Sequence, residues 1–105
     1  MIQSRKNKMK ILAIEKELSV LTLEQLFPFL NEEAIHAWEL FKSGFIREMY
    51  FRHDRHTVIL ILEAESIEKA ELVLRTLPLV EKGFIDFELI ALRAYDGFER
   101  LFAQS

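Results

Sequence analysis

The sequence predicts an α+β domain in which the elements run strand, helix, strand, strand, helix, strand. Short segments rich in apolar and β-branched residues alternate with two longer segments of helical periodicity. Only four polar residues, 53–56, separate the second strand segment from the third, which is typical of a hairpin. The chain has 105 residues, half of them hydrophobic, so it suits one domain with a packed core.

The first helix is predicted over residues 22–43. Thr22 and the glutamine three positions later have capping-box spacing, and Gly44 suits the left-handed residue that follows a helix. Pro28 removes one N–H inside the pattern and predicts a short helix, a kink and a longer helix. The expected apolar stripe follows i, i+3, i+4 spacing and consists of Leu23, Leu26, Phe27, Leu30, Ala34, Ala37, Trp38 and Phe41.

Four strands are predicted, at residues 9–15, 45–52, 57–64 and 84–92. The third strand, TVILILEA, is apolar on both faces and is therefore expected at the centre of its sheet. Strict alternation along the second strand places its side chains on two faces. One face is expected to hold Arg47, Met49 and Phe51, and the other Ile46, Glu48, Tyr50 and Arg52.

A second helix is expected between Ser66, a plausible N-cap, and Pro78, which ends it. Two right-handed crossovers then give the strand order 4-1-3-2, a ferredoxin-like βαββαβ fold with a four-stranded antiparallel sheet. Its two helices can cover only one face of the sheet. Because three strands are apolar on both faces, a second copy is expected to cover the other face, in a homodimer or a higher homo-oligomer.

The domain is predicted to span residues 9–105, with a flexible leader at 1–8 and a C-terminal tail. The tail carries four large apolar side chains that can pack back on the domain or onto a partner: Tyr95, Phe98, Leu101 and Phe102.

Composition excludes several classes of protein. The chain has no cysteine, which excludes disulfides, thiol catalysis and cysteine-ligated metals. The longest apolar run, residues 58–62, is too short to cross a membrane, so we expect a cytoplasmic protein with no membrane partner. Four basic residues and no acid lie in residues 1–10, whereas the remainder is acidic, which argues against a nucleic-acid partner.

Glu33 is the leading candidate for acid–base chemistry. It flanks the apolar stripe of the first helix, where it can reach a cavity at the edge of the sheet. A carboxylate held against apolar walls has a raised pKa and can transfer protons near neutral pH. The alternative is an ordinary exposed glutamate on a helix.

Two further groups are candidates for ligand binding. Asp86 and Glu88 share one face of the fourth strand and need partners there; Arg47 can supply the countercharge only across a dimer, because strands two and four lie at opposite edges. Trp38 and Tyr50 can line an aromatic pocket, although aromatic residues more often belong to the core.

The sequence predicts neither a metal nor a cofactor. His53, Asp54 and His56 offer metal-ligand types, but their spacing matches no known structural zinc site and a polar hairpin turn explains them equally well. There is no glycine-rich phosphate loop and no nucleophile elbow.

The segment from Gly44 to Leu92 resembles the muconolactone isomerase family of the dimeric α/β-barrel group. The turn Leu77-Pro78-Leu79 followed by Asp86 and Glu88 carries most of the resemblance, together with Gly44, Arg47 and the run Ala64 to Ser66. The resemblance implies a barrel built from two ferredoxin-like sheets, with small-molecule sites and often higher oligomers. It also implies that a proton is removed and returned to shift a double bond in a lactone, and it places Glu33 at the family's acidic helix position.

These observations give one leading hypothesis and one alternative. The first is a small-molecule isomerase acting on a small organic acid or lactone, with Glu33 as proton shuttle and Arg47 or Tyr50 stabilising an enolate-like oxygen. The alternative is a non-catalytic ligand-binding or oligomeric assembly module of the same fold.

Overall fold

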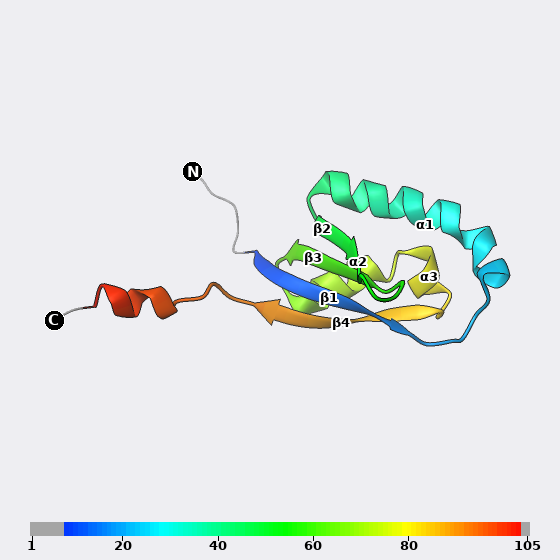
Figure 1. The fold of residues 1–105 in the computed structure, drawn as a ribbon. Coiled ribbons are helices and arrows are strands. Elements are labelled where there is room, and N and C mark those ends of the chain that lie inside the picture. Colours follow the sequence, from blue (N-terminus) through cyan, green and yellow to red (C-terminus); the bar gives the residue numbers. More distant parts are fainter. Residues whose placement is uncertain (1–7, 104–105) are drawn as a thin grey trace.

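A computed structural model describes residues 8–103 (Figure 1). The predicted leader at 1–8 therefore lies, apart from Lys8, outside the described residues. The elements agree with the predicted order, with one short extra helix before the last strand and one 3₁₀-helix after it. They are β1 (Met9–Glu17), α1 (Leu23–Ser43), β2 (Ile46–Phe51), β3 (Val58–Ala64), α2 (Ile67–Leu74), α3 (Pro78–Glu81), β4 (Ile85–Leu92) and η1 (Gly97–Leu101).

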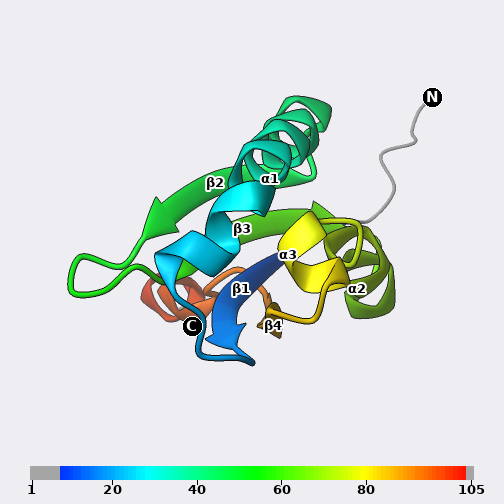
Figure 2. The same ribbon diagram turned by 90° about the vertical axis from the view of Figure 1, so that its right-hand side faces the viewer.

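The sheet is antiparallel throughout, with the strand order β2-β3-β1-β4. This confirms the predicted order 4-1-3-2, with β1 and β3 in the centre. Helices α1, α2 and α3 lie on one side of the sheet (Figure 2). The arrangement is compatible with a ferredoxin-like fold.

The core lies between this covered face, called here the inner face, and the helices. Ile11, Ala13, Leu60 and Leu62 point inward from the two central strands and are almost fully buried. They pack with buried side chains from α2, the α2–α3 connection and β4, namely Ala70, Leu74, Leu77, Ile85 and Phe87. Burial of these side chains is the main stabilising contribution to the fold.

Helix α1 begins and ends as its sequence predicts. Thr22 is the N-cap, with both hydrogen bonds of the capping box, and Gly44 takes the left-handed conformation at a φ of 92°. The predicted division at Pro28 is wrong, because α1 is continuous from Leu23 to Ser43. Pro28 lies near the start of the helix, where its missing N–H removes a single intrahelical bond.

The apolar stripe of α1 is only partly a core feature. Its inner part, including Leu26, Leu30 and Ala37, faces the sheet. Its outer part is 42–72% exposed and comprises Leu23, Phe27, Trp38 and Phe41. The expectation that Trp38 belongs to the core is therefore wrong for the isolated chain, because the apolar arc of α1 is wider than the contact the helix makes with β2 and α3.

Strand β2 departs from strict alternation. The pairing register with β3 shifts between Ile46 and Glu48, which leaves Arg47 as the extra residue of a bulge. Ile46 is consequently buried, and it lies on the inner face, the same face as the more exposed Met49 and Phe51, contrary to its predicted side. Arg47 is exposed beside the turn at Gly44 instead of pointing inward.

The opposite face of the sheet, called here the open face, is apolar in its centre. Register places one row of side chains across all four strands at Glu48, Ile61, Leu12 and Ile90, and the next row at Tyr50, Ile59, Ile14 and Glu88. No described helix covers this face (Figure 2). No helix within residues 8–103 has the length and apolar character needed to cross a membrane, and the predicted cytoplasmic location stays a prediction.

Candidate functional site

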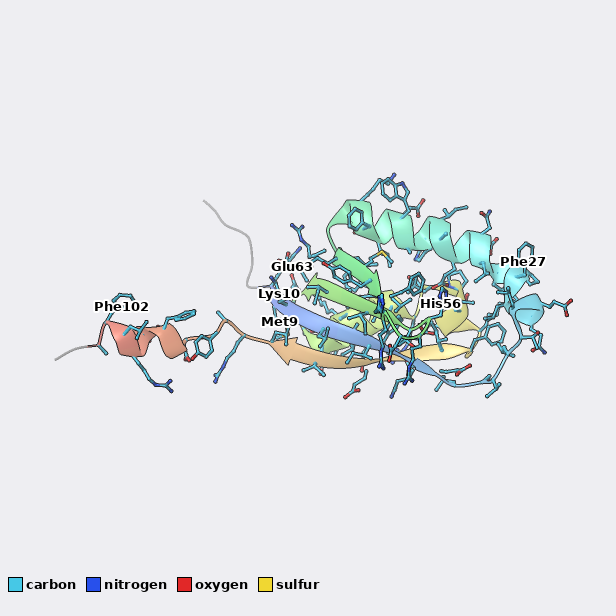
Figure 3. All side chains as sticks on the ribbon, in the orientation of Figure 1. Met9, Lys10, Phe27, His56, Glu63 and Phe102 are labelled. Atoms are coloured by element: carbon cyan, nitrogen blue, oxygen red, sulfur yellow. The ribbon has the colours of Figure 1, made fainter. Side chains whose placement is uncertain are left out.

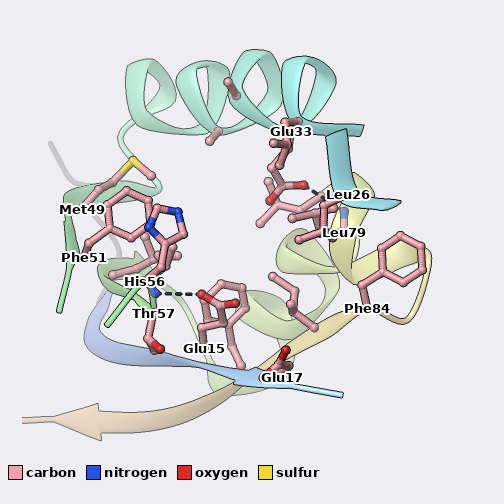
Figure 4. Close-up of a pocket in the computed structure, with 18 of the residues that line it drawn as sticks. Glu15, Glu17, Leu26, Glu33, Met49, Phe51, His56, Thr57, Leu79 and Phe84 are labelled. Atoms are coloured by element: carbon pink, nitrogen blue, oxygen red, sulfur yellow. Dashed lines mark hydrogen bonds between the residues drawn. The ribbon is translucent and has the colours of Figure 1, made fainter. Parts of the chain in front are cut away.

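A cavity of about 590 Å³ lies between α1 and the inner face of the sheet (Figure 4). It extends from the β2–β3 hairpin at one end to α3 and Phe84 at the other. Its walls are mainly apolar and include Leu26, Leu30, Ala37, Met49, Leu60, Leu79 and Phe87. A space of this size accommodates a small organic molecule.

Glu33 reaches into this cavity from α1 (Figure 4). Its Oε1 accepts a hydrogen bond of 2.8 Å from the backbone N–H of Leu79, in the first turn of α3. One turn along α1, His36 Nε2 lies 2.7 Å from the Thr76 hydroxyl, which itself donates to the carbonyl of Val73. Two polar contacts from α1 therefore reach the α2–α3 connection and the first turn of α3.

Two more carboxylates line the cavity from β1 and were not singled out in the sequence. Glu15 is half-buried, and its Oε1 accepts a 2.7 Å hydrogen bond from the backbone N–H of Val58. Glu17 is the next residue on the same face. Alternation along the strand is the signal that was missed. Ile11 and Ala13 point inward, so residues 15 and 17 also point inward when the strand extends to Glu17.

The β2–β3 hairpin supplies the basic groups of the site. Arg55 and His56 both line the cavity, and the His56 ring stacks on Phe51 with a centroid separation of 4.0 Å. At the other end Phe84 meets Phe29 edge-on, at 5.4 Å between centroids. The polar groups of the site thus come from α1, β1 and the β2–β3 hairpin, around a mainly apolar lining.

The structure separates Glu33 from the two residues proposed to assist it. Arg47 is the exposed bulge residue of β2 and does not line the cavity. Tyr50 projects on the open face, where its hydroxyl donates to Glu48 Oε1 at 2.6 Å. That hydrogen bond and the charge of Glu48 raise the pKa of Tyr50. Neither residue is placed to stabilise an oxygen of a molecule bound beside Glu33.

The three residues proposed to bind a ligand also lie outside the cavity. Trp38 is on the outer part of α1, stacked on Phe41 at 5.9 Å with Lys42 Nζ 5.7 Å from its ring centroid. Asp86 and Glu88 are exposed on the open face, because their neighbours Ile85 and Phe87 point into the core. Register sets Asp86 opposite Lys16, a closer countercharge than Arg47 at the far edge of the sheet.

Within residues 8–103 no group of three or more histidine and carboxylate side chains is arranged to hold a metal ion. In the hairpin turn Asp54 instead forms a two-point ion pair with Arg52, at 2.7 and 2.9 Å. This hydrogen bonding lowers the pKa of Asp54. His56 turns toward Phe51 and the cavity.

The pKa of Glu33 is raised above its ordinary value. Burial is the largest cause, because the charged form loses solvation in the cavity, and the negative charge of Glu15 adds to it. The N–H of Leu79 and the nearby His36 oppose the shift. A carboxylate in this environment exchanges a proton at a higher pH than an exposed one.

This shift predicts a pH-dependent contribution to stability. Since folding raises the pKa of Glu33, its favourable contribution is complete below about pH 4.3, the ordinary glutamate value, and is lost as pH rises through the folded value. The amide introduced by Glu33→Gln does not titrate and keeps an oxygen for the N–H of Leu79. As the pH rises from 4 to 7, the unfolding free energy of Glu33→Gln, measured in urea, should therefore increase relative to that of the unsubstituted protein at the same pH.

Glu32→Gln is the matched control, because Glu32 is the exposed neighbour on the same helix. Glu15 and His36 are unchanged in all three proteins, so their contributions cancel to first order in the comparison. Parallel stability curves for the unsubstituted protein and Glu33→Gln would contradict the raised pKa.

No protein-family model matches this chain, and no curated protein sequence matches it significantly. The resemblance to the muconolactone isomerase family therefore stays a prediction from the residues that carry it. The function has to be argued from the cavity and its side chains.

Proposed function

We propose that this protein is a small-molecule enzyme of muconolactone isomerase-like type, which shifts a proton within a small organic acid or lactone. One observation carries the proposal: Glu33, with a raised pKa, faces an apolar cavity of about 590 Å³. An apolar cavity with a few convergent polar groups is the usual form of a small-molecule site. A carboxyl group that titrates closer to neutral pH is suited to removing a proton and returning it.

In this mechanism the Glu33 carboxylate takes a proton from a saturated carbon, and the carbanion that is left is conjugated with a carbonyl group. The electron pair of the broken C–H bond shifts the double bond, negative charge develops on the carbonyl oxygen, and Glu33 returns the proton to a different carbon. The bond from Leu79 N–H orients the carboxylate through Oε1, so we assign the proton transfer to Oε2. Arg55 and His56 replace Arg47 and Tyr50 as the groups available to the oxygen or to a carboxylate of the substrate.

We further propose that the open face pairs with the same face of a second copy, which gives the homodimer and the barrel expected from the sequence. Support comes from the apolar centre of this face, where Leu12, Ile59 and Ile61 meet in register with no described element above them. Opposite charges are also neighbours in register there, Lys10 with Glu63 and Lys16 with Asp86. A face with both signs of charge can be self-complementary under a two-fold axis.

The alternative remains a non-catalytic ligand-binding or assembly module. It is favoured by the hydrogen bonds that Glu33 and Glu15 already make with backbone N–H groups, since both contacts also serve the fold. The two functions differ in whether a bound molecule undergoes exchange of its C–H protons.

The test follows proton exchange by NMR in D₂O for a panel of small unsaturated lactones and keto acids. We expect the protein to exchange or shift a C–H proton in one class of them. Ala37→Trp fills part of the cavity and should lower that rate by about 100-fold or more, because the substrate can no longer reach Glu33 in its productive geometry. Leu72→Trp, on the exposed side of α2, is the control and should keep the rate.

Binding without exchange, lost in Ala37→Trp, would favour the ligand-binding module. Exchange that survives Ala37→Trp would overturn the assignment of the cavity as the site.

A further inference from the structure

The C-terminal arm, residues 93–103, projects from the end of β4 and away from the rest of the molecule (Figure 1). With it the described chain measures 63 × 36 × 20 Å. Its four large apolar side chains, Tyr95, Phe98, Leu101 and Phe102, are 65–80% exposed. The tail was expected either to pack back on its own domain or to contact a partner, and in the structure it does not pack back.

The arm is nevertheless an ordered element with its own contacts. Residues Gly97–Leu101 form the 3₁₀-helix η1, and the ring of Tyr95 meets Phe98 edge-on at 5.0 Å. The Tyr95 ring lies directly over Gly97, in space that any side chain at that position would need. Because a 3₁₀-helix has three residues per turn, positions 98 and 101 lie on one side, and Tyr95 extends this apolar ridge.

The outer stripe of α1, formed by Leu23, Phe27, Trp38 and Phe41, is a further exposed apolar surface. Figure 3 shows Phe27 and Phe102 at opposite ends of the molecule, both pointing outward. The arm continues from β4 at one edge of the sheet, whereas α1 packs beside β2 at the other edge. The width of the sheet therefore separates the ridge from the stripe of the same chain.

We propose that the C-terminal arm of one copy docks its ridge on the outer stripe of α1 of a second copy. The ridge, Tyr95, Phe98 and Leu101, has two aromatic side chains and one leucine, and it is shorter than the stripe, so it covers the end of the stripe at Trp38 and Phe41. Aromatic side chains bury about 150–250 Å² each. With four aromatic side chains in each docking, a reciprocal exchange of two arms therefore buries about 1,200 Å², at the lower end of the range of specific interfaces. Asp96 and Glu99 on the arm can meet Lys42 at the end of the stripe.

This interface is separate from the proposed pairing of the open faces, and it does not depend on the chemistry of the cavity. The two interfaces together would build an assembly larger than a dimer, because each copy then presents two different surfaces to its neighbours.

Trp38 is the only tryptophan, so its fluorescence reports directly on whether the outer stripe is covered. We expect blue-shifted emission at concentrations where the protein is assembled. The double variant Phe98→Ala with Leu101→Ala should shift the emission to the red and raise the dissociation constant, measured by sedimentation, by about 30-fold or more. All substituted side chains are exposed, so the melting temperature at low concentration should not change.

Two controls make the test specific. Leu72→Ala removes an equally exposed apolar side chain from α2 and should leave emission and assembly unchanged. Phe41→Ala should weaken assembly as the arm variant does, with no further loss when the two are combined. The proposal is overturned if the arm variant leaves the emission of Trp38 unchanged. If assembly then weakens, the arm docks on another surface; if assembly also stays the same, the arm does not contribute to it.

Discussion

Glu33→Gln is expected to lower the rate of C–H proton exchange by about 10²–10⁴-fold, the usual contribution of a general acid–base group. Glutamine is nearly the same size and keeps an oxygen for the N–H of Leu79, so the contact between α1 and α3 should persist. It has no carboxylate to accept the proton. The substitution therefore removes the chemistry while leaving the cavity and its ligand affinity largely intact.

The measurement is the exchange rate in D₂O beside the dissociation constant for the same ligand. Glu32→Gln should keep the rate, since Glu32 is exposed on the same helix. Glu15→Gln offers a second readout. The charge of Glu15 raises the pKa of Glu33, so its removal should move the acid limb of the pH–rate profile to lower pH. Full activity in Glu33→Gln would mean that Glu33 has no catalytic role and serves only to cap α3.

The sequence predicted the fold because its local signals agree with one another. The caps at Thr22 and Ser66, the left-handed glycine after α1 and the apolar runs of the strands all act over a few residues. Crossover handedness then leaves little freedom in the strand order, and β2-β3-β1-β4 is the predicted one. Where the prediction was wrong, a tertiary or geometric effect decided the outcome.

The site was harder to predict than the fold. Glu33 was found because it flanks an apolar stripe. Arg47 was assigned to the wrong surroundings because a single bulge in β2 shifts which side chains face inward, and alternation alone cannot show a bulge. Glu17 was missed because the first strand was predicted to end at residue 15, and Glu15 was missed because it was taken only as the charged end of that strand.

Trp38 illustrates a different limit. Helical periodicity shows that a face of α1 is apolar, but it does not show what covers that face. The inner part of the stripe meets the cavity and the sheet, whereas Trp38 is more than half exposed and makes its ring contacts with Phe41 and Lys42 of its own helix. The same pattern therefore predicts burial without saying whether the burial is within one chain or between two.

Ile61→Glu tests directly whether the apolar open face is buried between two chains. Ile61 pairs with Leu12 in β1 and with Glu48 in β2, so it lies in the centre of the face that we propose to be the dimer interface. A glutamate there would bury an unpaired charge in each protomer, and two-fold symmetry brings both charges into one interface. We expect the dissociation constant of the dimer, measured by sedimentation, to rise by about 100-fold or more.

The matched control is Leu72→Glu, which introduces the same charge on the exposed side of α2 and should leave the dimer intact. The fold itself should tolerate Ile61→Glu in the monomer, because its neighbours Leu60 and Leu62, and not Ile61, point into the core. Two-state melting of a dilute, monomeric Ile61→Glu would separate lost assembly from lost folding. A dimer of unchanged affinity would mean that the copies meet elsewhere, since an apolar interface over Ile61 has no cation in that row to neutralise the new carboxylate.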